Sequence, residues 1–226
     1  AVVVCEADEK KIPALQLVLR QLETAGVPHV LFVNKIDKAD ATLRDTLKLM
    51  QTASSTPLVL RQIPIWKDGA AIGTIELALE RALVYREHAE SQEVPIPSDH
   101  QADELAARYE MLERLADYDD ELMEELLSDV APDRSQIFLD LRKEMRSGQI
   151  TQVFIGSAER GNGVTRLLKA LRHDAAGIDE TRARLGLAAG SETVVQVAKT
   201  VQTSHAGKLS IVRVLTGKLT DGLTLT

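Results

Sequence analysis

Two clusters of polar residues in this sequence each follow a run of apolar residues. The run "VLFV" leads directly into Asn34, Lys35 and Asp37, which place an amide, an ammonium and a carboxylate close together. A second run, "QVFI", leads into a glycine followed by Ser157 and Ala158. If both runs are strands of one parallel sheet, these residues lie beyond the carboxyl ends of the strands, where such sheets bind ligands.

The chemistry of the two clusters matches guanine, which presents different groups on its two edges. An ionised carboxylate only accepts hydrogen bonds, so Asp37 could accept from both the N1–H and the 2-amino group of the base. The backbone N–H of Ala158 could donate to O6 on the other edge, in a turn ordered by Ser157. Adenine would leave both protein groups without partners, and sites of this kind reject the wrong ligand strongly. We therefore predict that the two clusters hold one guanine base from opposite sides.

The remaining two polar residues have supporting roles in this interpretation. The aliphatic stem of Lys35 could lie flat on the base while its ammonium stays in water. Asn34 could donate to a ring nitrogen and also tie neighbouring loops together. The alternative is that both clusters are ordinary turn and cap residues, which are common at strand ends. Either motif also occurs by chance, but here each follows an apolar strand and precedes a helix, which favours recognition of guanine.

The segments that carry these clusters alternate between strand and helix patterns. Predicted strands cover 1–5, 29–33 and 57–65, and the run "ITQVFI" forms another. Helical spacing of apolar residues follows each of the first two strands, over 11–24 and over 40–52, where Asp40 is a possible N-cap. A further helix follows the glycine-rich turn after "QVFI". This alternation predicts an α/β fold with a mostly parallel sheet.

The rest of the chain departs from this alternation. A half-exposed strand is predicted over 72–80, a proline-broken connector over 91–100 and acidic helices over 101–146. After Gly190 the runs "TVVQVAKTV", "GKLSIVRVL" and "GLTLT" predict β-structure, too short for a closed barrel. We expect three parts: an α/β domain portion, an inserted acidic α+β subdomain, and the start of a β-barrel domain. The α/β domain portion covers 1–65 and 150–186. The insert covers 66–149, and the start of the β-barrel domain covers 191–226.

The composition excludes several classes of protein. A formal net charge of −7 argues against a broad nucleic-acid-binding face, so no DNA partner is expected. The single cysteine, Cys5, lies in an apolar run and allows no disulfide framework, which fits a reducing compartment such as the cytoplasm. No apolar run reaches membrane-spanning length. The histidines are scattered without the spacing of metal ligands, so no metal site is predicted in this chain.

The motifs in their order resemble translational GTPases. "AVVV", "VPHVLFVNKID" and "VFIGSAERGNGVTRLL" are similar to the second half of the GTP-binding domain of that family. "EVPIPSDH", "LERLADYDDELMEELLSD" and "LRKEMRSGQITQVFIGSA" resemble the subdomain that elongation factor G carries between its two base-recognition motifs. "HAGKLSIVRVLTGKLTDG" resembles the start of that factor's β-barrel second domain. The resemblance covers nearly the whole chain.

The resemblance implies a fold, a ligand and partners. It implies a GTPase-type α/β domain in which Asn34, Lys35 and Asp37 form the base-specificity motif, with Ser157 and Ala158 as the second base contact. It also implies GTP or GDP as the ligand, GTP hydrolysis with Mg²⁺ by a longer parent protein, and movement of tRNA and mRNA on the ribosome. The insert is implied to touch the ribosomal stalk protein, although an acidic helix is otherwise simply a solvated surface.

Two features separate this chain from the family pattern. No segment matches the phosphate-binding motif G-x-x-x-x-G-K-[ST], because "AGKLS" and "TGKLT" have leucine after the lysine and no first glycine. Both chain ends read as interrupted strands, so we expect a fragment that cannot hydrolyse GTP alone. The segment 172–190 contains no proline where the family has a short proline-containing linker. A paralogue acting in ribosome recycling, rescue or protection, or a binding module with little GTPase activity, is the alternative.

Overall fold

The computed structural model describes residues 1–39, 43–86, 89–188, 190, 192–205 and 207–224. The chain divides into two units, Ala1–Ala175 and Ala176–Thr226. The predicted N-cap at Asp40 lies outside the described residues. Among the helices that the structure describes, none combines the length and the apolar character needed to cross a membrane.

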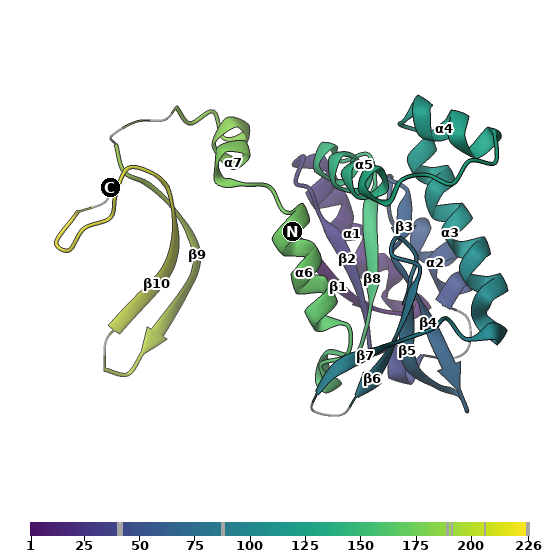
Figure 1. The fold of residues 1–226 in the computed structure, drawn as a ribbon. Helices are drawn as coiled ribbons and strands as arrows, with labels where there is room; N and C mark the ends of the chain where they lie inside the picture. The colour runs from purple at the N-terminus through teal and green to yellow at the C-terminus, as the bar shows by residue number, and fades with distance from the viewer. Residues whose placement is uncertain (40–42, 87–88, 189, 191, 206, 225–226) are drawn as a thin grey trace. The chain divides into compact units, whose positions relative to one another are not determined.

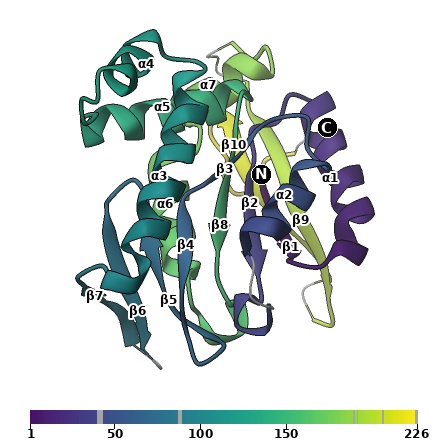
Figure 2. The ribbon, with the colours of Figure 1, turned by 90° about the vertical axis from the view of Figure 1, so that its right-hand side faces the viewer.

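The first unit contains a parallel sheet whose central strands are buried on both faces (Figures 1 and 2). Its strands lie in the order β1 (Val2–Glu6), β2 (Val30–Asn34), β8 (Thr151–Ile155) and β3 (Leu58–Leu60). Alternate residues of β2 enter two different cores: Leu31 and Val33 pack with helices α1 (Ile12–Thr24) and α2 (Leu43–Gln51) on one face. Val30 and Phe32 pack into the larger core on the other face. Burial on both faces explains why β2 is continuously apolar from Val30 to Val33, and the predicted α/β fold with a parallel sheet is confirmed.

The larger core is completed by the segment between β3 and β8. This segment forms an antiparallel sheet and three helices, and a fourth helix follows β8. The strands are β4 (Gln62–Lys67), β5 (Ala70–Glu76), β6 (Arg81–Arg86) and β7 (Ala89–Val94). The helices are α3 (Gln101–Ala116), α4 (Asp120–Leu127), α5 (Arg134–Ser147) and, after β8, α6 (Val164–Asp174). The α+β character predicted for the insert is therefore confirmed.

The chain passes from the parallel sheet to the antiparallel sheet at Arg61. The backbone N–H of Arg61 donates to Val153 of β8 at 3.0 Å, and its carbonyl accepts from the N–H of Leu77 at 3.1 Å. The single strand predicted over 57–65 is therefore wrong, because β3 and β4 belong to different sheets. One buried residue joins the two sheets by main-chain hydrogen bonds.

The side chain of Arg61 is also buried at this junction. Its guanidinium lies over the rings of Phe138 and Phe154, 5.3 and 5.4 Å from their centroids. It also approaches Asp174 at the end of α6, with Nη1 3.7 Å from Oδ2. Burial lowers the pKa of Arg61 to about 10, which still leaves the group charged at neutral pH. A buried cation thus contacts α5, β8 and α6 at once.

Two predicted exposure patterns of the insert are wrong. The strand predicted over 72–80 ends at Glu76, and Glu76 is 4% exposed instead of facing water. Arg81 and Arg166 pair with the carboxylate of Glu76, and this pairing allows the charged group to be buried. The helical spacing over 101–116 predicts one buried stripe on α3, formed by Leu105, Tyr109, Leu112 and Ala116. Leu112 and Ala116 are buried, whereas Leu105 and Tyr109 are 68% and 50% exposed. The buried face of α3 is centred on Met111 and Leu115, because this helix packs against α4, α5 and β3.

The described residues of the second unit form one helix and one hairpin. Helix α7 (Ile178–Arg184) precedes the long antiparallel strands β9 (Val194–Thr203) and β10 (Gly207–Thr216). The strand predicted for "GLTLT" is not formed over 222–224, where a turn closes with a hydrogen bond from Leu223 to Thr220.

A buried carboxyl group in the insert makes stability depend on pH. Asp140 of α5 is 2% exposed, and Gln136 donates to its Oδ1 at 3.0 Å. Burial, with help from the negative charge of Asp119, raises the pKa of Asp140 from 3.8 to about 6. The folded state therefore keeps this proton where the unfolded chain has released it, so stability falls as the pH rises from about 4 to about 6.

We expect Asp140→Asn to remove this pH dependence, because the amide keeps the shape and the acceptor oxygen without a charge. The melting temperature of the variant minus that of the wild type should increase as the pH rises from 4 to about 6. Between about pH 6 and pH 8 this difference should stay constant. A difference that does not change with pH would contradict the assignment.

Candidate guanine-binding site

The two predicted clusters lie side by side because β2 and β8 are neighbours in the sheet. The parallel register pairs Val33 with Ile155. The hydrogen bonding then continues beyond the strands: Gly156 donates to Val33 at 3.0 Å, and Ile36 donates to Gly156 at 3.1 Å. The two loops that follow the strands are therefore joined by main-chain contacts at the carboxyl edge of the sheet.

Asn34 connects the two clusters directly. Its side-chain Oδ1 accepts a hydrogen bond from the backbone N–H of Ala158 at 2.8 Å, between residues 124 positions apart in the sequence. This bond places the predicted O6 donor next to the predicted base-specificity motif. It also means that the Ala158 N–H already has an acceptor in this structure.

Asp37 has a carboxylate that is only partly satisfied. The side chain is 9% exposed and lies after β2 in a short 3₁₀ turn, Ile36–Lys38. Its Oδ2 is 3.5 Å from Nε of Arg160, whereas no described residue donates a hydrogen bond to its buried Oδ1. An unpaired buried oxygen costs free energy unless a donor reaches it, so this atom is suited to accept from a ligand N–H.

Lys35 has a distinctive backbone and a fixed ammonium. Its φ and ψ of 61° and 36° are in the left-handed region, which turns the chain away from the strand direction. Its Nζ is 2.7 Å from Oε1 of Glu6, and Lys11 holds the other oxygen of Glu6 at 2.6 Å. Hydrogen bonds from Lys11 and then Lys35 lower the pKa of Glu6 to about 2. Glu6 therefore stays charged and restrains the end of the Lys35 side chain.

Glu6, Lys11 and Arg160 are further neighbours of the site, and none of them is predicted from the sequence. Glu6 ends β1 in register with Asn34, so its position after "VVVC" at the same edge of the sheet is a usable sequence signal. The pairing of Arg160 with Asp37 has no such signal, because it depends on the path of the loop after β8.

Cys5 borders this region without contributing a reactive group. It is half-buried and pairs with Val33 in the sheet. Burial, and secondarily the charge of Glu6, raise the pKa of the Cys5 thiol to about 12, so the thiolate is scarce at neutral pH.

The loop after β8 is shaped by close backbone approaches. Ser157 is 1% exposed, and its N–H donates to the carbonyl of Asn162 at 3.0 Å, which folds the loop back on itself. A Cβ atom at Gly156 would collide with that Asn162 carbonyl and would lie 2.7 Å from the Phe32 ring. Only glycine fits between the two, so the loop's geometry depends on this residue.

The family of the chain is established by comparison. Residues 1–176 match the family model described as "Elongation factor Tu GTP binding domain", which covers more than half of the chain. The chain therefore belongs to this family of translational GTPases. Within the family, its curated relatives carry the names elongation factor G and elongation factor G-like protein.

Three of these relatives illustrate the degree of similarity. The chain is 37% identical over 223 residues to the "Elongation factor G-like protein" of Synechocystis sp. (strain ATCC 27184 / PCC 6803 / Kazusa), covering 98% of this chain and 33% of that protein. It is 31% identical over 174 residues to "Elongation factor G 2" of Geobacter metallireducens, covering 76% of this chain and 25% of that protein. It is 29% identical over 236 residues to "Elongation factor G 1" of Geobacter sulfurreducens, covering 98% of this chain and 34% of that protein. The chain thus spans a quarter to a third of their lengths.

A solved structure supports the fold. A crystal structure of a protein from Thermus thermophilus superposes with a TM-score of 0.71 at 23% sequence identity, over 87% of this chain and 28% of that chain. This likeness agrees with the mixed α/β architecture described above.

The tight contacts of Gly156 generate a testable prediction. Gly156→Ala should lower the free energy of unfolding by about 1–3 kcal/mol, because the added methyl group overpacks the turn. Gly177→Ala is the matched control, since Gly177 has φ of −70° and nothing within 4 Å of the place that an added methyl group would take. Urea unfolding of both variants measures the difference, and equal losses would argue against the steric role of Gly156.

Proposed function

We propose that this chain supplies the guanine-recognition edge of a ribosome-associated GTPase related to elongation factor G. The observation that carries the proposal is the carboxylate of Asp37, whose Oδ1 is buried without a hydrogen-bond donor among the described residues. Guanine offers two adjacent donors, N1–H and the 2-amino group, that would satisfy both oxygens of this carboxylate. The base would replace Arg160, which is 3.5 Å from Oδ2 and has a largely exposed side chain.

The other predicted residues complete the recognition of the base. The N–H of Ala158 would donate to O6, sharing or replacing its present acceptor on Asn34. The Nδ2 group of Asn34 remains available to donate to a ring nitrogen. The stem of Lys35 would cover one face of the base, with its ammonium held by Glu6. Ser157, which is buried in the returning loop, would hold the Ala158 N–H in place.

Family membership supports a proposal for the role of the full-length protein. We infer that it binds GTP and GDP, hydrolyses GTP and drives translocation on the ribosome, with ribosomal RNA and the stalk protein as partners in the cytoplasm. For the domain organisation we propose a GTP-binding portion over 1–65 and 150–186, an insert over 66–149 and a β-barrel domain beginning at 191–226. The acidic helices of the insert are the surface that would meet the stalk protein.

The chemistry at the phosphates is not assigned to residues of this chain. The sequence contains no G-x-x-x-x-G-K-[ST] motif, whose lysine and hydroxyl group would contact the phosphates and Mg²⁺. Among the described residues, no three His, Cys, Asp or Glu side chains are placed to share a metal ion. We therefore assign recognition of the base to this chain and no catalytic residue.

A paralogue of elongation factor G is the second candidate. Identity to the elongation factor G-like protein is 37%, against 31% and 29% to two proteins named elongation factor G. The proline-free segment 172–190 favours the same candidate. Such a paralogue would use the same base site in a different ribosome-linked process, such as recycling, rescue or protection.

Replacing the carboxylate of Asp37 with an amide tests its proposed role in recognition of guanine. In the full-length protein, Asp37→Asn should lose preference for GTP and gain preference for xanthosine triphosphate, whose 2-position carries an oxygen that the new amide can meet. The change in the ratio of affinities should approach roughly four decades. Asp117→Asn, at an exposed position, is the matched control. Unchanged preference for GTP, measured by competition binding, would remove Asp37 from base recognition.

The purified 226-residue chain should show no GTP turnover above that of buffer. Without phosphate-binding and switch residues, nothing stabilises the charge that develops in the transition state. Phosphate release should be followed with the full-length protein as the positive control. Turnover that rises in proportion to the concentration of the chain would overturn this expectation.

A further inference from the structure

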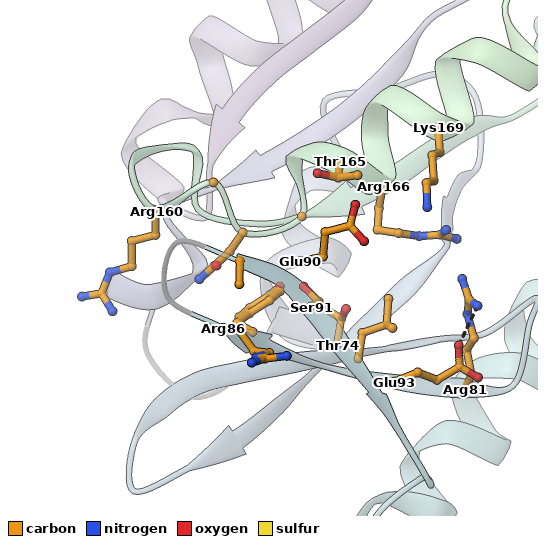
Figure 3. Close-up of a pocket in the computed structure, with 16 residues that line it drawn as sticks. Thr74, Arg81, Arg86, Glu90, Ser91, Glu93, Arg160, Thr165, Arg166 and Lys169 are labelled. Carbon is orange, nitrogen blue, oxygen red and sulfur yellow. Dashed lines mark hydrogen bonds and ion pairs between the residues drawn. The ribbon is translucent and has the colours of Figure 1, made fainter.

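A cavity next to the base site, with Arg160 as a residue common to both, has the properties of a second binding site. It has a volume of about 520 Å³ and lies between the strands β5 to β7 of the antiparallel sheet and the segment that leads into α6 (Figure 3). Pockets of this size typically hold small organic ligands. Its walls include the apolar side chains of Leu83 and Ala89 and the ring of Tyr85.

The charged residues that line the cavity are mostly cationic, although the chain as a whole has a net charge of −7. The acidic residues are Glu90 and Glu93. The basic residues of the lining are Arg81, Arg86, Arg160, Arg166 and Lys169. Positive charge concentrated in a concave surface raises the local concentration of anions, which points to a negatively charged ligand.

The cations differ in how far the protein already neutralises them. Arg81 and Arg166 both pair with the buried carboxylate of Glu76 beneath the cavity, and Arg81 also pairs with Glu93 at 2.8 Å. In contrast, neither Arg86 nor Lys169 forms an ion pair within the described part of the chain. These two exposed side chains are therefore free to meet a ligand, above a layer of fixed arginines.

The start of α6 adds hydrogen-bond donors to the same cavity. Gly163 is the N-cap of this eleven-residue helix, has φ of +77°, and supplies no side-chain cap. The N–H of Val164 donates to the carbonyl of Gly161 at 3.4 Å, so the donors of the first turn that can meet an anion are those of the residues that follow, together with the partial positive charge of the helix dipole. Gly163 and Thr165 line the cavity, so both a backbone segment and a hydroxyl group face it.

We propose that this cavity binds a small phosphorylated organic anion, attracted by the charges of Arg86 and Lys169 and with its phosphate near the start of α6. Guanidinium, ammonium, hydroxyl and backbone N–H groups together suit the tetrahedral oxygens of a phosphate. The organic part would contact the apolar wall formed by Leu83, Tyr85 and Ala89. The concave shape and limited volume of the cavity favour a small molecule over the backbone of a nucleic acid, which needs an extended basic strip.

Glu90 opposes such a ligand and provides an internal test. Figure 3 shows its carboxylate among the lining residues, on the side of Thr165 and Arg166. Removing its charge should strengthen binding of a phosphate, whereas removing the charges of Arg86 and Lys169 should weaken it.

The experiment titrates the ¹⁵N-labelled 226-residue chain with ribose 5-phosphate, with inorganic phosphate and with a uridine hexanucleotide, while amide shifts are followed by NMR. Ribose 5-phosphate should move the amides of Gly163 and Thr165 and leave those of Asn34 and Ala158 in place. It should bind more tightly than inorganic phosphate, because only the sugar phosphate contacts the apolar wall. Arg86→Gln with Lys169→Gln should raise the Kd about tenfold or more. Glu90→Gln should lower it.

The control variant carries Lys48→Gln with Arg172→Gln, which changes the net charge equally at exposed positions outside the cavity. Its Kd should change by less than about twofold. An equal loss in the control, or shifts confined to the base site, would overturn the proposal. So would an absence of binding, or tighter binding of the hexanucleotide than of the sugar phosphate. Melting temperatures of all variants separate loss of binding from loss of folding.

Discussion

The candidate base site depends on one interaction, the parallel pairing of β2 with β8. Residues far apart in the sequence lie in register there, and the hydrogen bonding continues past the strand ends through Gly156. The bond between Asn34 and Ala158 is possible only because both loops leave the sheet at the same level. Because the pairing is buried on both faces, it fixes the relative position of the two motifs more firmly than their exposed loops could.

Arg61 has a corresponding role between the sheet and the insert. Its backbone bonds to both sheets, and its guanidinium contacts two aromatic rings and the end of α6. A buried cation requires all of these partners, since water cannot replace them. The insert is therefore packed onto the GTPase-type sheet as part of one core, with Val30 and Phe32 of β2 among its members.

Periodicity in the sequence predicted the parallel sheet, the helices of the insert and the meeting of the two polar clusters. Those predictions succeeded where apolar runs are long and both faces are buried, as in 29–33. They failed where tertiary charge pairing decides the outcome. The burial of Glu76, the switch of sheets at Arg61 and the contact of Arg160 with Asp37 all depend on partners distant in sequence. No local pattern encodes such partners.

The insert occupies the connection between β3 and β8, two neighbouring parallel strands. Parallel strands always need a crossover of a dozen residues or more, so the whole subdomain elaborates a link that the topology already requires. The entropy of closing such a link grows only slowly with its length. The subdomain can accordingly expand, shrink or exchange its outer helices during evolution, while the candidate base site at the sheet's edge keeps its geometry.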